Sequence, residues 1–134
     1  MRLSVITLLV LAGCPENRVT PFNANPEATI TSHEEGDVVA PGLIELRGNV
    51  SDPDDTAENL LALWVVDGTT ACVAEAPTSQ GTSLCSAFVS EPVANIVLEV
   101  RDPYGAAGNH TIDLEVGDVP NDDPTILILS LIHI

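Results

Sequence analysis

Short stretches in which apolar and polar residues alternate recur along most of this 134-residue chain. From Ala28 onward, clusters of Gly, Pro, Asn and Asp separate these stretches about every ten residues, a spacing typical of a β-sandwich. Because successive side chains of a strand point to opposite faces, each stretch buries one face and leaves the other in water. We therefore predict an all-β sandwich of about seven to eight strands.

The expected strands cover residues 28–32, 37–40, 43–50, 60–66, 70–74, 83–89, 94–101 and 109–116. The clearest alternations predict a core made of Ile44, Leu46, Val50, Ile96, Leu98, Val100, Ile112, Leu114 and Val116. Trp64 is the sole tryptophan and lies in the middle of a predicted strand. We expect it to pack in this core, with exposure as a platform for a ligand as the alternative.

The N-terminus has the features of an export signal. Arg2 precedes the apolar run VITLLVLA, which is as long as the apolar region of a signal peptide and too short to span a bilayer. The run ends in LAGC, which resembles the lipobox of bacterial lipoproteins, in which the cysteine is lipidated and becomes the mature N-terminus. We interpret residues 1–13 as a lipoprotein signal peptide, Cys14 as the lipidation site and 14–27 as a tether. The alternative is an ordinary signal peptide that leaves Cys14 as a free thiol.

The other two cysteines, Cys72 and Cys85, are predicted to form a disulfide. Assigning Cys14 to lipid leaves an even number of cysteines in an oxidising compartment. The turn-forming residues between them predict a long hairpin whose two neighbouring strands the disulfide would join. Free or metal-binding thiols are the alternative, although no further thiol or imidazole ligand lies nearby in the sequence.

Acidic residues outnumber basic ones by 20 to 4, and lysine is absent. Such a charge excludes a nucleic-acid partner. The nucleophile-elbow, zinc-protease and phosphate-loop motifs are absent, and neither His33 nor His110 has a catalytic partner fixed by sequence. We therefore predict that the chain is not an enzyme and that both histidines are ordinary surface residues.

Several turns resemble those of a known domain family. The relevant segments are NANPEATITS, VSDPDD, the strand residue Trp64, the turn Asp67-Gly68, and VRDPYG. Together they resemble bacterial immunoglobulin-like domains of the PKD and cadherin-like type. The resemblance implies an immunoglobulin-like Greek-key β-sandwich over residues 28–118. This sequence departs from the family at Asp55, where glycine is usual. Its predicted disulfide also differs from the cross-sheet disulfide of antibody domains.

The acidic turn after residue 51 is a candidate cation site. Asp52, Asp54 and Asp55 offer hard carboxylate oxygens of the kind that Ca²⁺ prefers, and Asp102 joins them if the loops cluster at one pole. The alternative is a solvated turn in which the aspartates cap backbone N–H groups. No other cofactor is expected.

The C-terminal residues 119–134 resemble the start of a second module. The pattern around Asn23 and Pro26 recurs around Asn121 and Pro124, at an offset of 98 residues. We therefore expect a truncated gene, and residues 129–134 resemble the translation of a sequencing adapter. The alternative is a genuine apolar strand at the C-terminus.

These observations predict a lipoprotein of the bacterial cell envelope, at the outer membrane or cell surface. Its module would serve as a structural spacer or as a domain that interacts with a protein or polysaccharide. Two alternatives stay open: the non-catalytic stalk of a surface hydrolase, and a calcium-dependent adhesion module.

Overall fold

The computed structural model describes residues 22–119. The predictions for residues 1–21, Cys14 among them, and for residues 120–134 lie outside this range. Eight strands and one 3₁₀ turn follow one another along the described chain: β1 Glu27–Ile30, β2 Val38–Val39, β3 Gly42–Ser51, η1 Ala57–Asn59, β4 Leu61–Val66, β5 Thr69–Glu75, β6 Thr82–Val89, β7 Val93–Arg101 and β8 Ala107–Val116. Residues 22–119 contain no helix with the length and apolarity needed to cross a membrane.

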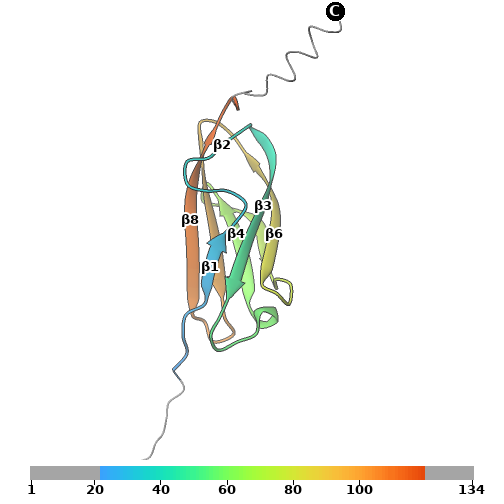
Figure 1. The fold of residues 1–134 in the computed structure, drawn as a ribbon, viewed down its shortest axis with the longest axis vertical. Helices are drawn as coiled ribbons and strands as arrows, with labels where there is room; N and C mark the ends of the chain where they lie inside the picture. The colour runs from blue at the N-terminus through green and yellow to red at the C-terminus, as the bar shows by residue number, and fades with distance from the viewer. Residues whose placement is uncertain (1–21, 120–134) are drawn as a thin grey trace, which may run out of the picture.

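The strands form the two facing sheets of a β-sandwich (Figure 1). One sheet has three strands in the order β1-β3-β6, and the other has five in the order β2-β8-β7-β4-β5. All pairs are antiparallel except β2 with β8, which is parallel. The predicted immunoglobulin-like β-sandwich is therefore confirmed.

The apolar faces of the two sheets meet in a single aliphatic core around Trp64. Of the predicted core residues, Ile44 is only half-buried and packs against the edge of the core, whereas the others are buried. Gly48 completes the β3 alternation, and its missing side chain leaves room for the Trp64 ring: an added Cβ would lie 3.1 Å from Trp64 Cζ2. The indole N–H of Trp64 donates to Ser83 Oγ at 2.8 Å, which confirms Trp64 as a core residue with its polar atom satisfied.

The segment 37–40, predicted as a strand, contributes only the two-residue β2. Its brevity follows from its neighbours, because Pro41 cannot donate a ladder hydrogen bond and Gly36 has a positive φ of 86° that ends the extended backbone. The short strand nevertheless places Val39 O within 2.9 Å of the Gly117 N–H, which holds the end of β8.

The chain enters the module at one pole and leaves it at the opposite one (Figure 1). At the first pole the backbone of Pro26 passes so close to Gly108, near the start of β8, that an added Cβ there would overlap the Pro26 carbonyl. At the far end of the same strand the chain departs at Gly117. Nine residues of extended β-strand separate these two glycines, a span of about 30 Å.

Candidate metal centre

The Asp52 loop follows directly after β3. Asp52 Oδ1 accepts hydrogen bonds from the N–H groups of Asp54 at 2.6 Å and Asp55 at 3.1 Å, which closes the turn. This is the local capping that the sequence presented as the alternative to cation binding. It uses only one of the two Asp52 oxygens, so the other stays free for a different partner.

Asp102 occupies the equivalent place after β7. Its Oδ1 accepts from Tyr104 N–H at 2.8 Å and Ala106 N–H at 2.9 Å, and its Oδ2 accepts from Asn23 Nδ2 at 2.7 Å. Only 7% of Asp102 is exposed. Gly105, with a φ of 95°, supplies the left-handed residue that this tight turn requires.

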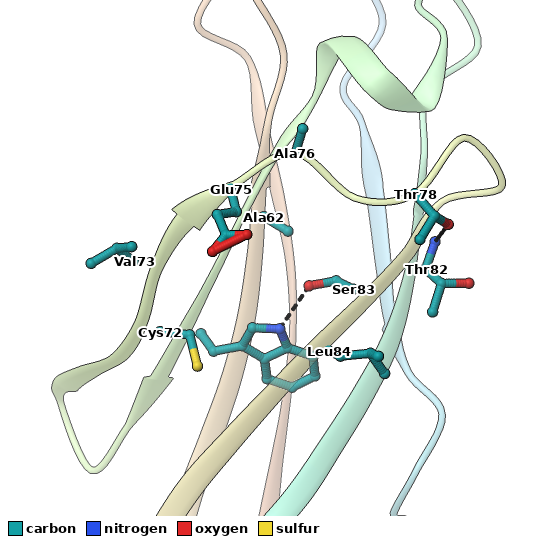
Figure 2. A pocket seen from close by; sticks show the side chains of 10 residues that line it. Ala62, Cys72, Val73, Glu75, Ala76, Thr78, Thr82, Ser83 and Leu84 are labelled. Carbon is teal, nitrogen blue, oxygen red and sulfur yellow. Dashed lines mark hydrogen bonds between the residues drawn. The ribbon is translucent and has the colours of Figure 1, made fainter.

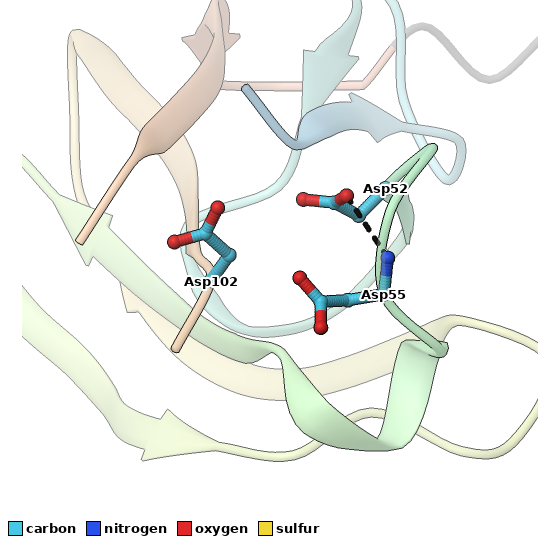
Figure 3. Close-up of side chains that lie close together, drawn as sticks. All are labelled: Asp52, Asp55 and Asp102. Atoms are coloured by element: carbon cyan, nitrogen blue, oxygen red, sulfur yellow. Dashed lines mark hydrogen bonds between the residues drawn. The ribbon is translucent and has the colours of Figure 1, made fainter. Parts of the chain in front are cut away.

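Carboxylates from these two loops converge at the pole where the chain enters. β3 and β7 belong to different sheets but end at the same pole, so the loops that follow them meet there (Figure 3). One carboxylate oxygen each from Asp52, Asp55 and Asp102 lies within 4.8 Å of the others. The fourth predicted residue, Asp54, is not part of this group. It is exposed, and its Oδ2 accepts from Ala24 N–H at 2.6 Å.

The pKa values of Asp55 and Asp102 shift in opposite directions. Partial burial, together with the charges of Asp52, Asp102 and Asp54, raises the pKa of Asp55. Burial also opposes ionisation of Asp102, but hydrogen bonds from Asn23 and from the backbone N–H groups of its own turn hold the pKa of Asp102 below its ordinary value. Ionised Asp102 therefore lies beside Asp55, whose own ionisation is disfavoured.

Two oxygens at the centre have no hydrogen-bond donor among residues 22–119. Asp52 Oδ2 and Asp55 Oδ2 are both buried from solvent and unpaired. A buried carboxylate oxygen without a partner is unfavourable unless a cation or a donor completes it. Oxygen donors of this kind suit Ca²⁺, which accepts carboxylates, carbonyls and waters in flexible geometry.

The chain leading into the module is part of this pole. Residues 14–27 were predicted as a tether, yet Asn23 and Ala24 are hydrogen-bonded to the aspartate loops and Pro26 is fully buried. Sequence reasoning missed these contacts because Asn and Pro are equally typical of flexible linkers and of tight packing at a module boundary.

The Cys72–Cys85 disulfide is confirmed, with a Cα–Cα distance of 6.0 Å. Its predicted setting was wrong. β5 and β6 are not neighbours in one sheet but the edge strands of different sheets, so the disulfide links the sheets. The chain crosses from one sheet to the other between the two cysteines instead of folding back as a hairpin.

The two histidines differ in their surroundings. His33 is half-buried, and its Nδ1 contacts the Oγ of the adjacent Ser32 at 2.9 Å. His110 is half-buried, and its Nδ1 accepts the Ile30 N–H at 2.8 Å, which links β8 to β1 across the two sheets. The sequence carries no signal for this structural contact of His110.

No protein-family model matches the chain. No curated protein sequence matches it either. Among solved structures, it is similar to the fibronectin(III)-like modules of Clostridium thermocellum CbhA, with a TM-score of 0.60 and 14% identity over 74% of this chain and 52% of that one. It is also similar to an engineered protein, with a TM-score of 0.52 and 17% identity over 72% of this chain and 21% of that one.

A conjugative transposon lipoprotein from Bacteroides eggerthii has a TM-score of 0.46 and 13% identity over 66% of this chain and 95% of that one. The present chain spans about half the length of the CbhA structure and about a fifth of the engineered protein. The likeness to the CbhA modules and to the engineered protein supports the β-sandwich fold and nothing finer.

Proposed function

We propose that the protein is a lipid-anchored spacer of the bacterial cell envelope. The observation that carries this proposal is the path of the chain, which enters at one pole of a sandwich and leaves at the other (Figure 1). A module with this path adds about 30 Å of length between the segments on either side. Arranged in this way, it holds whatever follows it away from the membrane without any chemistry of its own.

Two further features support an exported and anchored protein. The LAGC segment that ends at Cys14 supplies the acceptor for lipid, and acyl chains on that cysteine anchor a protein stably to a membrane. The disulfide fits an oxidising compartment outside the cytoplasm. The outer membrane or cell surface is the proposed location.

The turn residues around Asp52 and Asp102 favour the PKD type among immunoglobulin-like modules.

Metabolic labelling tests the anchor. The full-length precursor is expressed in a Gram-negative host with radiolabelled palmitate, beside a Cys14→Ser variant and a control variant with Cys72→Ser and Cys85→Ser. We expect label and detergent-phase partitioning in the wild type and the control, and loss of both in Cys14→Ser. Equal labelling of the Cys14→Ser variant, or no labelling of any form, contradicts the proposal.

A second candidate function is favoured by the unpaired oxygens at the pole: binding of Ca²⁺ by Asp52, Asp55 and Asp102. A bound cation would offset the repulsion among the three carboxylates and satisfy both buried oxygens. Because Asn23 and Ala24 are hydrogen-bonded to the same loops, the ion would also stiffen the joint between tether and module.

Thermal unfolding with and without the ion tests calcium binding. The sample is the mature chain carrying Cys14→Ser, at 10 mM CaCl₂ or MgCl₂ and with chelator. Sites of extracellular modules have dissociation constants of about 10⁻⁴–10⁻³ M, so 10 mM Ca²⁺ stabilises by about 1.4–2.7 kcal/mol. This corresponds to a rise in Tm of about 5–20 °C.

The matched pair of variants for this test is Asp55→Asn at the centre and Asp118→Asn, an exposed aspartate at the opposite pole. The rise in Tm should disappear in Asp55→Asn and persist in Asp118→Asn. An unchanged Tm in the unsubstituted protein, or an equal rise in Tm in both variants, contradicts calcium binding at this centre.

A further inference from the structure

Within residues 22–119, the strand arrangement leaves one edge of the sandwich open. β5 and β6 end different sheets and face each other across a gap that the Cys72–Cys85 disulfide crosses. We call this gap, between residues 69–75 and 82–89, the β5–β6 seam. On one side of the disulfide it widens into a groove of about 240 Å³ beside Trp64 (Figure 2), and on the other into one of about 380 Å³ beside Ala87.

β6 lacks the features that usually protect an edge strand. Its eight residues, TSLCSAFV, include no charge and no proline. Its register with β3 runs without a bulge from Gly42↔Val89 to Asn49↔Thr82. By contrast, β5 is irregular in its pairing with β4 and ends in Glu75. A regular, uncharged edge with exposed apolar side chains is the kind to which a further strand adds.

The outer face of β6 carries an apolar pattern with an acidic group in its middle. Leu84 is 57% exposed and Phe88 71%, and Phe88 lies opposite Leu43, which is 70% exposed. Between Leu84 and Phe88, the Ser86 hydroxyl donates to Glu45 Oε2 at 3.2 Å, which holds a carboxylate beside the centre of β6. The outward side chains of β6 are therefore apolar at Leu84 and Phe88, with the Glu45 carboxylate of β3 beside Ser86 between them.

We propose that β6 binds an extended polypeptide segment of a partner protein, with apolar residues at positions i and i+4 and Lys or Arg at i+2. The backbone groups of the free edge supply hydrogen bonds, and the alternate side chains supply specificity. The apolar pair covers Leu84 and Phe88, and the cation lies beside Ser86 and reaches across it to Glu45 on β3. A second copy of this chain is the wrong occupant, because its net charge of −16 repels itself and its edge offers no cation.

Arg47 sets the register of the partner. Arg47 lies on β3 opposite Leu84, so its positive charge repels a basic residue of the partner at that end. Beside Ser86, the same basic residue is attracted by Glu45. The proposal is independent of lipidation and of calcium, since none of these residues belongs to the N-terminal tether or to the aspartate loops.

Fluorescence anisotropy with defined peptides tests the proposal. The probe is a labelled heptapeptide with Leu, Lys and Phe at positions two, four and six and Thr elsewhere, and its matched partner has Glu in place of Lys. The protein is the mature chain carrying Cys14→Ser, beside variants Phe88→Ser and Glu45→Lys. Tyr104→Ser is the control, because Tyr104 is an aromatic of similar exposure, 76%, in the Asp102 turn.

We expect the Lys peptide to bind up to about fivefold more tightly than the Glu peptide. Glu45 lies one strand further away, across Ser86, so its attraction to Lys is that of an exposed ion pair. Phe88→Ser should weaken binding about tenfold, Tyr104→Ser should leave it unchanged, and Glu45→Lys should reverse the preference between the peptides. The absence of binding at millimolar peptide overturns the proposal. Binding that is unchanged in Phe88→Ser also overturns it. So does a preference for the Lys peptide that weakens with salt but stays the same in Glu45→Lys. Sedimentation that shows a dimer lost in Phe88→Ser assigns the edge to a second copy and also overturns it.

Discussion

Removing the Cys72–Cys85 disulfide is predicted to lower the free energy of unfolding by about 3 kcal/mol. The disulfide closes a loop between residues 13 apart in sequence. The entropy of a loop of this size, which the unfolded chain regains on reduction, amounts to about 3 kcal/mol. In a module of about 100 residues, that loss corresponds to a fall in Tm of about 12–24 °C.

The position of the disulfide adds a structural reason. β5 and β6 share no backbone ladder, so without the cross-link only side-chain packing holds the two sheets together at this edge. Cys85 is itself buried in the core, so replacing it by alanine removes a small additional amount of packing. The stability lost when the wild type is reduced therefore measures the cross-link alone. The stability lost in the alanine variant includes both the cross-link and the packing of Cys85.

Urea unfolding followed by the fluorescence of Trp64 measures both effects, because this sole tryptophan is buried. The oxidised protein is compared with the reduced protein and with the double variant Cys72→Ala/Cys85→Ala. Removing the cross-link should also increase the urea m value, since the unfolded chain becomes more expanded. A loss below about 1 kcal/mol with an unchanged m value would refute the reasoning.

Three further predictions use the same urea titration. Gly48→Ala should cost about 1–3 kcal/mol, because the added methyl group overlaps the leucine beside it and crowds Trp64; a neutral result contradicts the tight approach. Ser83→Ala should cost about 1–3 kcal/mol by leaving the indole N–H unpaired, and an equally stable variant shows that water or another group replaces the hydroxyl. The raised pKa of Asp55 means that its contribution to stability is present below its ordinary pKa of 3.8 and is lost as pH rises through the folded value. With chelator, Asp55→Asn should therefore be more stable than wild type at pH 7, with the difference gone at pH 3. The lowered pKa of Asp102 has the opposite sign, so Asp102→Asn should be less stable at pH 7 and equal to wild type only once pH falls through the folded pKa. Parallel pH profiles of the two variants contradict this assignment.

Much of the fold follows from the local pattern of the sequence. The alternation of apolar residues predicted the long strands to within one or two residues, for example 43–50 against Gly42–Ser51 and 109–116 against Ala107–Val116. The period of two decides which side chains face the core, because a shift by one residue would expose all of them. Ile44 departs from this rule because it lies near one end of β3, where the core thins out.

The partners of each strand could not be predicted from this pattern. The same residues between Cys72 and Cys85 fit a hairpin within one sheet and a crossing between two sheets, and only the packing of the whole chain distinguishes them. The candidate metal centre has the same limit. Asp52 and Asp55 are neighbours in sequence, but Asp102 joins them only because β3 and β7 end at one pole of the sandwich. The contribution of Asn23 depends on the same long-range arrangement.

The spacer proposal rests on the separation of the two poles, and a spin-label distance measures it directly. Labels are attached at Asn25→Cys and Asp118→Cys, both exposed positions at opposite ends of the module, in mature protein that carries Cys14→Ser and retains the native disulfide. Pulsed electron paramagnetic resonance should give one narrow distribution centred at about 30–40 Å, the span of β8 plus the label arms. A distance below about 20 Å, or a broad distribution without a maximum, would contradict a rigid module that carries the chain from one pole to the other.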